Sequence, residues 1–320
     1  MASGEPTRPL ILVTNDDGID SPGLRAAAEA AALVGDILIA APITPQTGMG
    51  RSFPRGQTHG IIEILSRPLG DALHSYHAVH GSPAQAVAHA ILEIAPRRPV
   101  LCISGINDGE NLGGTNLISG TVGAAAEAAG FGIPAMAISI DSDHAERFLK
   151  PYDPADWKVP SGIIHRLARL MLQQALHPDL AFLNVNIPQE ATLETEIRVT
   201  SQSRQNHYSC AAAGVRDLSR PFRLPVTAQI DFETLERESD LYAFVVDRVI
   251  SVTPMGRDLT LRDTAGRPLD IGFPKPGATD RKMALAAKQA LPHSMDISRH
   301  RSASSPSAVA CRHEDSSDRN

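Results

Sequence analysis

Strand-length apolar runs that alternate with alanine-rich helical stretches constrain the fold of this chain most strongly. Between residues 10 and 188 the runs include LILVT, DILIAAP, PVLCIS and PAMAIS, and stretches such as PGLRAAAEAAALV and GTVGAAAEAAGF stand between them. These runs are continuously apolar, which is typical of a parallel sheet covered by helices on both faces. We therefore predict an α/β fold with a Rossmann-like, doubly wound and mostly parallel sheet.

The repeating pattern ends near residue 195, where polar and turn-rich sequence follows. We predict a Rossmann-like core over 9–195, a β-rich arm or hairpin with a C-terminal helix over 196–292, and a disordered polar tail over 293–320. Within the second region, LYAFVVDRVISVTPM (241–255) predicts a strand pair that turns at Asp247 and Arg248, and 279–291 predicts a helix.

Charge and cysteine content narrow the classes of function. The net charge of -6 and the lack of a long Lys/Arg run argue against binding to a nucleic-acid polymer. Cys102, Cys210 and Cys311 lie far apart without a CxxC motif, so neither a zinc site nor a disulfide framework is indicated. No signal peptide or membrane-spanning run is evident, and we expect a soluble, cytoplasmic protein without membrane partners.

Polar residues follow three of the predicted strands. In an open parallel sheet, ligands bind beyond the carboxyl ends of the strands, so these residues are expected to meet on one rim. They are Asn15, Asp16 and Asp17 after the first strand, Thr47 and Gly48 after the second, Ser104 at the end of PVLCIS, and Gly105, Asn107 and Asn111 after it.

The adjacent acids Asp16 and Asp17 require compensation if the strand end is buried, because two close carboxylates repel and desolvation disfavours their charge. With neutral oxygens from Thr47 and Asn107 they form a hard, all-oxygen donor set that suits Mg²⁺, Mn²⁺ or Ca²⁺. The alternative is that the acids cap the helix that begins near Ser21.

The segment LISGTVGAAAEAAG enters a predicted helix through Ser119, Gly120 and Thr121. Backbone amides and hydroxyls at a helix N-terminus favour an anion such as phosphate, although an ordinary Ser or Thr cap has the same sequence. A metal beside a phosphate site predicts phosphate-ester cleavage. No covalent-phosphatase signature is present, which favours direct attack by metal-activated water.

Several segments together resemble the SurE family, the stationary-phase survival proteins that act as metal-dependent 5′-nucleotidases. They are VTNDDGIDSPGL, APITPQTGMGRS, GSPAQAV, SGINDGENLGGTNLISGTVGAAAEAAGFGIPAMAIS, NVNIP and VISVTPMGRDLT, and they extend over most of residues 10–260. The resemblance implies one divalent ion per subunit, Mg²⁺ or Mn²⁺, held by Asp16, Asp17, Thr47 and Asn107. The family usually has Ser at the position of Thr47, whose extra methyl stiffens the side chain.

The same resemblance implies a function and an assembly. The expected activity is hydrolysis of nucleoside 5′-monophosphates, with 3′-nucleotides and short polyphosphate as further candidate substrates, in a homodimer or homotetramer that exchanges C-terminal arms. Asp16, Asp17 and Asn107 are the expected catalytic residues. The expected substrate contacts are Asn15, Gly48, Ser104, Gly105, Asn111, Ser119, Gly120 and Thr121.

Two other functions are weighed against the nucleotidase. A receiver-like signalling module also places paired acids around Mg²⁺, but DILIAAP and PAMAIS are not followed by the phospho-accepting Asp and the Lys that it requires. An inactive family member that serves as an oligomeric scaffold is disfavoured because all four expected ligands offer oxygen. Base preference, 5′ against 3′ position, the physiological metal and dimer against tetramer are left open.

Overall fold

The structure, a computed structural model, describes residues 8–141 and 151–270. The predicted helix over 279–291 and the predicted tail over 293–320 lie outside these residues. The described residues up to Leu259 belong to one unit, and those from Thr260 belong to a second. Among the described residues, no helix combines the length and the apolar character needed to cross a membrane.

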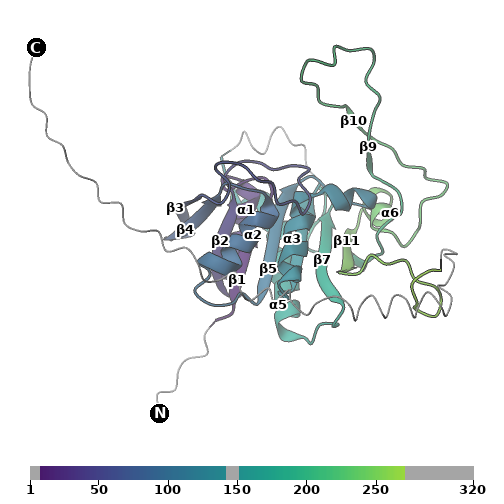
Figure 1. Cartoon of the computed structure of the whole chain (residues 1–320). Coiled ribbons are helices and arrows are strands. Elements are labelled where there is room, and N and C mark those ends of the chain that lie inside the picture. Colours follow the sequence, from purple (N-terminus) through teal and green to yellow (C-terminus); the bar gives the residue numbers. More distant parts are fainter. Residues whose placement is uncertain (1–7, 142–150, 271–320) are drawn as a thin grey trace, which may run out of the picture. The chain divides into compact units, whose positions relative to one another are not determined.

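Nine strands form the central sheet in the order β3-β4-β2-β1-β5-β6-β7-β11-β8 (Figure 1). Their bounds are β1 Leu10–Thr14, β2 Asp36–Pro42, β3 Ile62–Leu69, β4 Ala72–Val79, β5 Leu101–Asp108, β6 Ala135–Ile140, β7 Leu180–Ile187, β8 Ile197–Val199 and β11 Ile250–Gly256. The six strands from β4 to β7 are parallel to one another, whereas β3 and β11 run antiparallel to β4 and β7. The predicted mostly parallel α/β sheet is confirmed.

Helices cover both faces of this sheet. The α-helices are α1 Pro22–Ala32, α2 Pro83–His89, α3 Gly120–Gly130, α5 Lys158–Gln173 and α6 Asp240–Val245, and the short η helices are η1 Ala90–Ile94, η2 Gly114–Ile118 and η3 Pro154–Trp157. The helices α1 and α5 pack together on one face, and α2 and α3 pack together on the other. Ala and Gly residues on α1 and α3 are buried, and their small size allows these helices to lie close against the strands.

The described chain after β7 adds two strands to the central sheet and also forms a separate small sheet. The strands β11 and β8 pair parallel to each other at one end of the central sheet. A separate antiparallel hairpin joins β9 (Tyr208–Cys210) to β10 (Val226–Ala228). In Figure 1 this hairpin extends away from the central sheet.

The predicted strand pair over 241–255 is wrong in its first half, because residues 240–245 form the helix α6. Ser239 caps this helix by accepting a hydrogen bond from the Tyr242 backbone N–H at 3.1 Å. The apolar residues Leu241 and Phe244 are spaced by one helical turn and pack in a buried cluster with Leu112. Capping and helical burial outweigh the strand-like composition of this segment.

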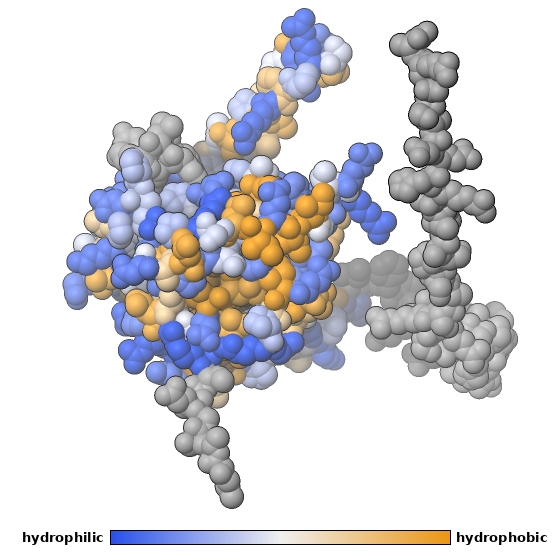
Figure 2. Space-filling view, turned by 90° about the vertical axis from the view of Figure 1, so that its left-hand side faces the viewer, coloured by the Kyte–Doolittle hydropathy of each residue, from blue (hydrophilic) through white to orange (hydrophobic). Residues whose placement is uncertain are grey.

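Apolar side chains are exposed at the edge of the central sheet that lies farthest from β8, where β3 pairs with β4. Ile64 and Leu73 lie on these two strands and are 69% and 72% exposed. Figure 2 looks onto the side of the molecule that is on the left of Figure 1 and shows an apolar area surrounded by polar residues. The helices of the described chain therefore do not cover this edge completely.

Candidate active site

A cavity of about 680 Å³, here called the acidic cavity, opens beyond the carboxyl ends of the central strands β1, β2 and β5. All four expected metal ligands line it, together with three of the expected substrate contacts. The ligands are Asp16, Asp17, Thr47 and Asn107, and the contacts are Gly48, Asn111 and Ser119. Side chains from loops far apart in the sequence thus face one space, as the topology of the sheet requires.

The loops after β1 and β2 are joined by backbone contacts. The Gln46 N–H donates to the Asp16 carbonyl oxygen at 2.7 Å. Gly18 has a φ of +94°, and a Cβ at this position would lie 3.1 Å from the Pro45 nitrogen. This conformation and close approach favour glycine, and they hold the loop that carries Thr47 against the acid pair.

Asp16 lies at the N-terminus of α3. The Thr121 hydroxyl donates to its Oδ1 at 2.5 Å, and a Cβ on Gly120 would lie 2.7 Å from its Oδ2. Burial raises the pKa of Asp16 to about 6, although hydrogen bonds from the Thr121 hydroxyl and from the backbone of Thr121 and Gly120 act in the opposite direction. The helix start is therefore built closely around this carboxylate.

Asp17 is in a less favourable position than Asp16. Burial raises its pKa well above the usual value, and the negative charge of Asp16 raises it further. The opposing contact is a hydrogen bond from the Asp108 N–H, at 3.2 Å. Within the described residues no cation is paired with either carboxylate. An ionised pair in this position requires positive charge from a ligand.

Neither acid caps α1, which was the alternative interpretation. The N-cap of α1 is Ser21, whose side chain makes no capping hydrogen bond, and Pro22 follows it in the first turn. The acids instead point to the acidic cavity. Their placement excludes a capping role at this helix.

The donor set fits a hard divalent ion. Asn107 uses its Nδ2 to donate to the Gly109 carbonyl at 2.5 Å, which leaves its Oδ1 as an acceptor, and Thr47 contributes an exposed hydroxyl. In the part of the chain that the structure describes, no group of three or more His, Cys, Asp or Glu residues is arranged to hold a metal. A site here consequently depends on two carboxylates with neutral oxygens, the chemistry that Mg²⁺ and Mn²⁺ accept.

Five of the expected substrate contacts do not line the acidic cavity. They are Asn15, Ser104, Gly105, Gly120 and Thr121. Asn15 donates through Nδ2 to the Gly18 carbonyl at 3.0 Å, and Thr121 donates to Asp16. Ser104 is fully buried in β5, beside Thr14 of β1. These five residues therefore lie beneath the residues that line the acidic cavity. Their direct role in substrate binding stays a prediction.

Comparison with known proteins identifies the family. The family model described as "Survival protein SurE" matches residues 11–209. The chain belongs to the SurE family. A protein named 5′-nucleotidase SurE from Thermococcus kodakarensis is 34% identical over 252 residues, which cover 79% of this chain and 94% of that protein. Another of the same name, from Methanocella arvoryzae, is 36% identical over 253 residues, with coverages of 78% and 92%.

A solved structure has the same fold. The crystal structure of the SurE protein from Aquifex aeolicus matches with a TM-score of 0.61 and 28% sequence identity. The match covers 79% of this chain and 95% of that one. The α/β architecture described above is thus that of a SurE protein.

Several residues that line the acidic cavity of this SurE chain are not predicted by its sequence pattern. They include Asp108, Glu110, Tyr208 and Arg223. Arg223 is the one cationic side chain among the described residues that line the cavity. Tyr208 and Arg223 come from residues 207–228, which contain β9 and β10 and are here called the hairpin region. The hairpin region is about 100 residues away from Glu110 in the sequence. No local sequence pattern therefore predicts that its residues line the acidic cavity.

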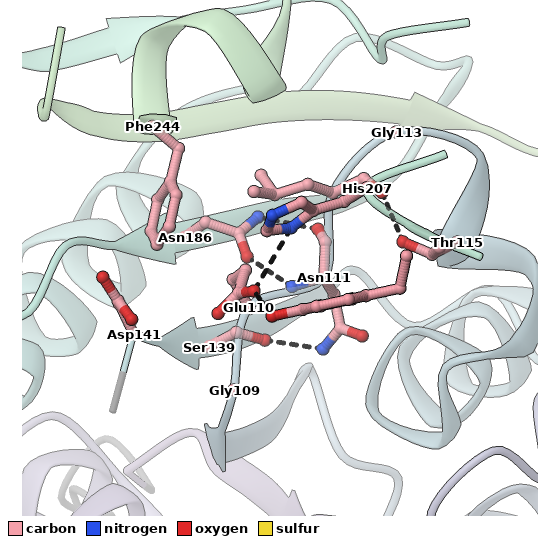
Figure 3. A network of polar contacts seen from close by, with 12 residues as sticks. Gly109, Glu110, Asn111, Gly113, Thr115, Ser139, Asp141, Asn186, His207 and Phe244 are labelled. Atoms are coloured by element: carbon pink, nitrogen blue, oxygen red, sulfur yellow. Dashed lines mark hydrogen bonds and ion pairs between the residues drawn. The ribbon is translucent and has the colours of Figure 1, made fainter. Parts of the chain in front are cut away.

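Glu110 is held by two residues of the hairpin region. The Tyr208 hydroxyl donates to Glu110 Oε1, and His207 Nδ1 lies 3.2 Å from the same oxygen. Figure 3 shows His207 directed towards Glu110. Burial alone would raise the pKa of Glu110, but the contacts with His207 and Tyr208 outweigh it and lower the pKa to about 2. Glu110 is therefore an ionised carboxylate whose partners are part of the fold.

Asn111 ties the loop after β5 to the neighbouring strands (Figure 3). Its N–H donates to Asn186 Oδ1 at 2.7 Å, and its Nδ2 donates to the Ser139 hydroxyl at 2.8 Å. Its carbonyl oxygen accepts from Nδ2 of both Asn184 and Asn186 at 2.9 Å. These contacts with β6 and β7 fix the position of Asn107 and Glu110 on the rim.

Proposed function

We propose that this chain is a divalent-metal-dependent phosphomonoesterase that hydrolyses nucleoside 5′-monophosphates to nucleoside and phosphate. The observation that carries the proposal is the buried pair Asp16 and Asp17, which lines an open cavity and has no cationic partner within the described residues. Membership of the SurE family supports it, since the curated relatives are named 5′-nucleotidases. A pair without compensation is stable in ionised form only with a bound cation.

Asp16, Asp17, Thr47 and Asn107 would hold one Mg²⁺ or Mn²⁺ per subunit. When bound, such an ion neutralises phosphate charge and lowers the pKa of a water ligand. The chain itself fixes the donor oxygens in advance. Thr121 holds Asp16, the Asp108 N–H holds Asp17, and the Gly109 carbonyl orients the amide of Asn107.

The chain also provides groups for the phosphate. Arg223 offers a guanidinium to phosphate oxygens in a cavity otherwise lined by acidic and neutral side chains. Ser119 lines the same cavity while its hydroxyl accepts from the Val122 N–H at 3.1 Å, so its own O–H proton is available to a ligand. Phosphate is thus bound between the acid pair, the start of α3 and the hairpin region.

Further properties are proposed on the family resemblance. They are activity on 3′-nucleotides and short polyphosphate, assembly as a homodimer or homotetramer through C-terminal arms, and a cytoplasmic location. Purified protein and defined substrates test the first two properties directly.

Phosphate release from a panel of nucleoside 5′-monophosphates tests the proposed function. Reactions contain EDTA, Mg²⁺ or Mn²⁺ and compare wild type with Asp16→Asn and Asn107→Ala. Asp36→Asn is the matched control, because Asp36 lies at the amino end of β2 and pairs with Arg97 at 2.8 Å. We expect metal-dependent release that the first two changes abolish and the control retains. Folded wild type without release under any metal would reject the nucleotidase and favour a scaffold role.

A further inference from the structure

A second cavity, here called the tyrosine cavity, adjoins the acidic cavity. It has a volume of about 470 Å³, and Tyr76 and Tyr152 are among the residues that line it. Asp17 and Pro45 line both cavities. A molecule whose phosphate is bound at the acid pair can therefore extend its remaining part into the tyrosine cavity.

One wall of the tyrosine cavity carries a platform in which the Arg25 guanidinium is stacked over the ring of Tyr152. The Arg25 guanidinium carbon lies 4.1 Å from the centroid of the Tyr152 ring. Both groups are held by Glu29, which accepts from the Tyr152 hydroxyl at 2.7 Å and from Arg25 Nε at 3.0 Å. The platform is thus organised before a ligand binds, and planar groups of this kind stack well on aromatic bases.

The two arginines that line the tyrosine cavity are already paired with carboxylates. Arg25 is paired with Glu29, and Arg67 is paired with Asp20 while it also donates to the Ile19 carbonyl at 3.3 Å. A second phosphate would need positive charge that is not committed to a carboxylate. The cavity therefore suits an uncharged part of a ligand better than another anion.

The remaining surface of the tyrosine cavity is largely apolar, with a few donors. Ile43, Pro45 and Pro68 contribute apolar surface, and the Tyr76 side chain is almost fully buried beside them. The two Nη groups of Arg25 donate no hydrogen bond to any described residue, so they are available to acceptors on a ligand. Apolar walls with few convergent donors are typical of a site for a small aromatic molecule.

We propose that the tyrosine cavity binds the nucleoside part of the substrate, with the base stacked on the platform of Tyr152 and Arg25. This inference rests on the proposed function, in which the phosphate occupies the acidic cavity. Stacking and contacts from Arg25 tolerate every base, because each base has an aromatic face and acceptor atoms. Tyr152 and Arg25 are then the residues that distinguish nucleotides from phosphate esters without a base.

A comparison of two phosphate esters, one with a base and one without, tests this inference. The kcat/KM values for adenosine 5′-monophosphate and ribose 5-phosphate are compared in wild type, Tyr152→Leu and Tyr152→Phe. The leucine removes the aromatic face, and the phenylalanine retains it. We expect Tyr152→Leu to lower kcat/KM for adenosine 5′-monophosphate by about 5- to 150-fold. Ribose 5-phosphate should change by less than about 3-fold, and Tyr152→Phe should restore most of the loss.

Tyr208→Leu is the matched control, since Tyr208 lines the acidic cavity on its hairpin side. If Tyr208→Leu rather than Tyr152→Leu removes the preference for the base, the nucleoside lies at the hairpin and the inference is overturned. An equal loss for both substrates in Tyr152→Leu, or no loss for either, also overturns it. These results leave the proposed hydrolysis itself intact.

Binding of adenosine, which carries no phosphate to hydrolyse, separates the inference from the proposed function. Affinity is measured by titration calorimetry or by competition in wild type, Tyr152→Leu and Tyr152→Phe. Weaker adenosine binding in Tyr152→Leu, with wild-type affinity in Tyr152→Phe, supports the nucleoside site. This support holds even if wild type releases no phosphate, a separate result that would reject the proposed function. Adenosine affinity that is absent in wild type or unchanged by Tyr152→Leu would reject the inference.

Discussion

The acid pair Asp16 and Asp17 and a third acid, Glu110, line the same cavity, yet their surroundings shift their pKa values in opposite directions. Glu110 receives contacts from His207 and Tyr208, and its pKa falls to about 2. The pair has no cationic partner among the described residues, and burial raises the pKa of both members. A buried carboxylate whose partners belong to the fold stabilises that fold, whereas one without such partners indicates a missing ligand.

Removal of one charge from the acid pair is expected to have the largest effect. Asp17→Asn should lower phosphate release by at least about 100-fold, since it removes a metal ligand. In EDTA the same change should leave the melting temperature equal to or above that of wild type, because it relieves burial of a charge and repulsion by Asp16. Calorimetry with and without EDTA measures this. A melting temperature well below wild type in EDTA would contradict the account.

Addition of the metal should stabilise wild type and leave Asp17→Asn nearly unchanged. An ion at about 100 times its dissociation constant raises the free energy of unfolding by about 2.7 kcal/mol when it binds the folded state alone. Urea titrations at several Mn²⁺ concentrations follow this increase. Equal stabilisation of wild type and Asp17→Asn would show that the ion binds elsewhere.

Replacement of Glu110 should show the opposite pattern to Asp17→Asn. Glu110→Gln weakens the contacts with Tyr208 and His207 and should cost about 1–3 kcal/mol of stability, with activity within about 10-fold of wild type. The folded pKa of about 2 lies below the ordinary value of 4.5, so the stabilisation is present above pH 4.5 and is lost as the pH falls towards 2. Unfolding followed over this range should be less pH-dependent in Glu110→Gln. An identical pH profile would remove Glu110 from the stabilising set.

Arg223→Ala should weaken the substrate more than the fold. Loss of one charged hydrogen bond to phosphate corresponds to about 1.5–3 kcal/mol, and we expect KM to rise by about 10-fold or more while the melting temperature changes little. Arg216→Ala is the matched control, because Arg216 lies in the same hairpin region, stacks on Phe222 and does not line the acidic cavity. A similar rise in KM for both variants would indicate a general effect of the hairpin.

The smallest effects are expected from replacing the N-cap serines of two helices, of which one serine also lines the acidic cavity. Ser119→Ala and Ser82→Ala remove the N-caps of α3 and α2 and should each cost about 1 kcal/mol of stability. Ser119 lines the acidic cavity, so its loss should also raise KM, whereas loss of Ser82 should not. Steady-state kinetics with thermal melting compares the two. An unchanged KM in Ser119→Ala would limit this residue to capping.

The parts of the fold that depend on local pattern were predictable from the sequence. Continuous apolar strands, alanine-rich helices and polar strand ends are local signals, and they brought Asp16, Asp17, Thr47 and Asn107 to one rim. The end of β5 was not predictable, because the strand continues through Asp108 with polar residues.

That extension of β5 explains why Ser104 and Gly105 lie inside the sheet rather than beyond it. Glu110, Tyr208 and Arg223 depend on how a distant hairpin folds back, which no local pattern reports. The helix α6 depended on a cap at Ser239 and on burial against Leu112, and both outweighed its strand-like residues.

Direct counting of bound Mn²⁺ in wild type, Asp17→Asn and Glu110→Gln shows whether the acid pair binds a metal ion and whether Glu110 is needed for that binding. Electron paramagnetic resonance of free Mn²⁺ in protein titrations gives the number of sites and their affinity. We expect one site per chain in wild type, loss of that site in Asp17→Asn and its retention in Glu110→Gln. Retention of the site in Asp17→Asn, or its loss in Glu110→Gln alone, would contradict this expectation.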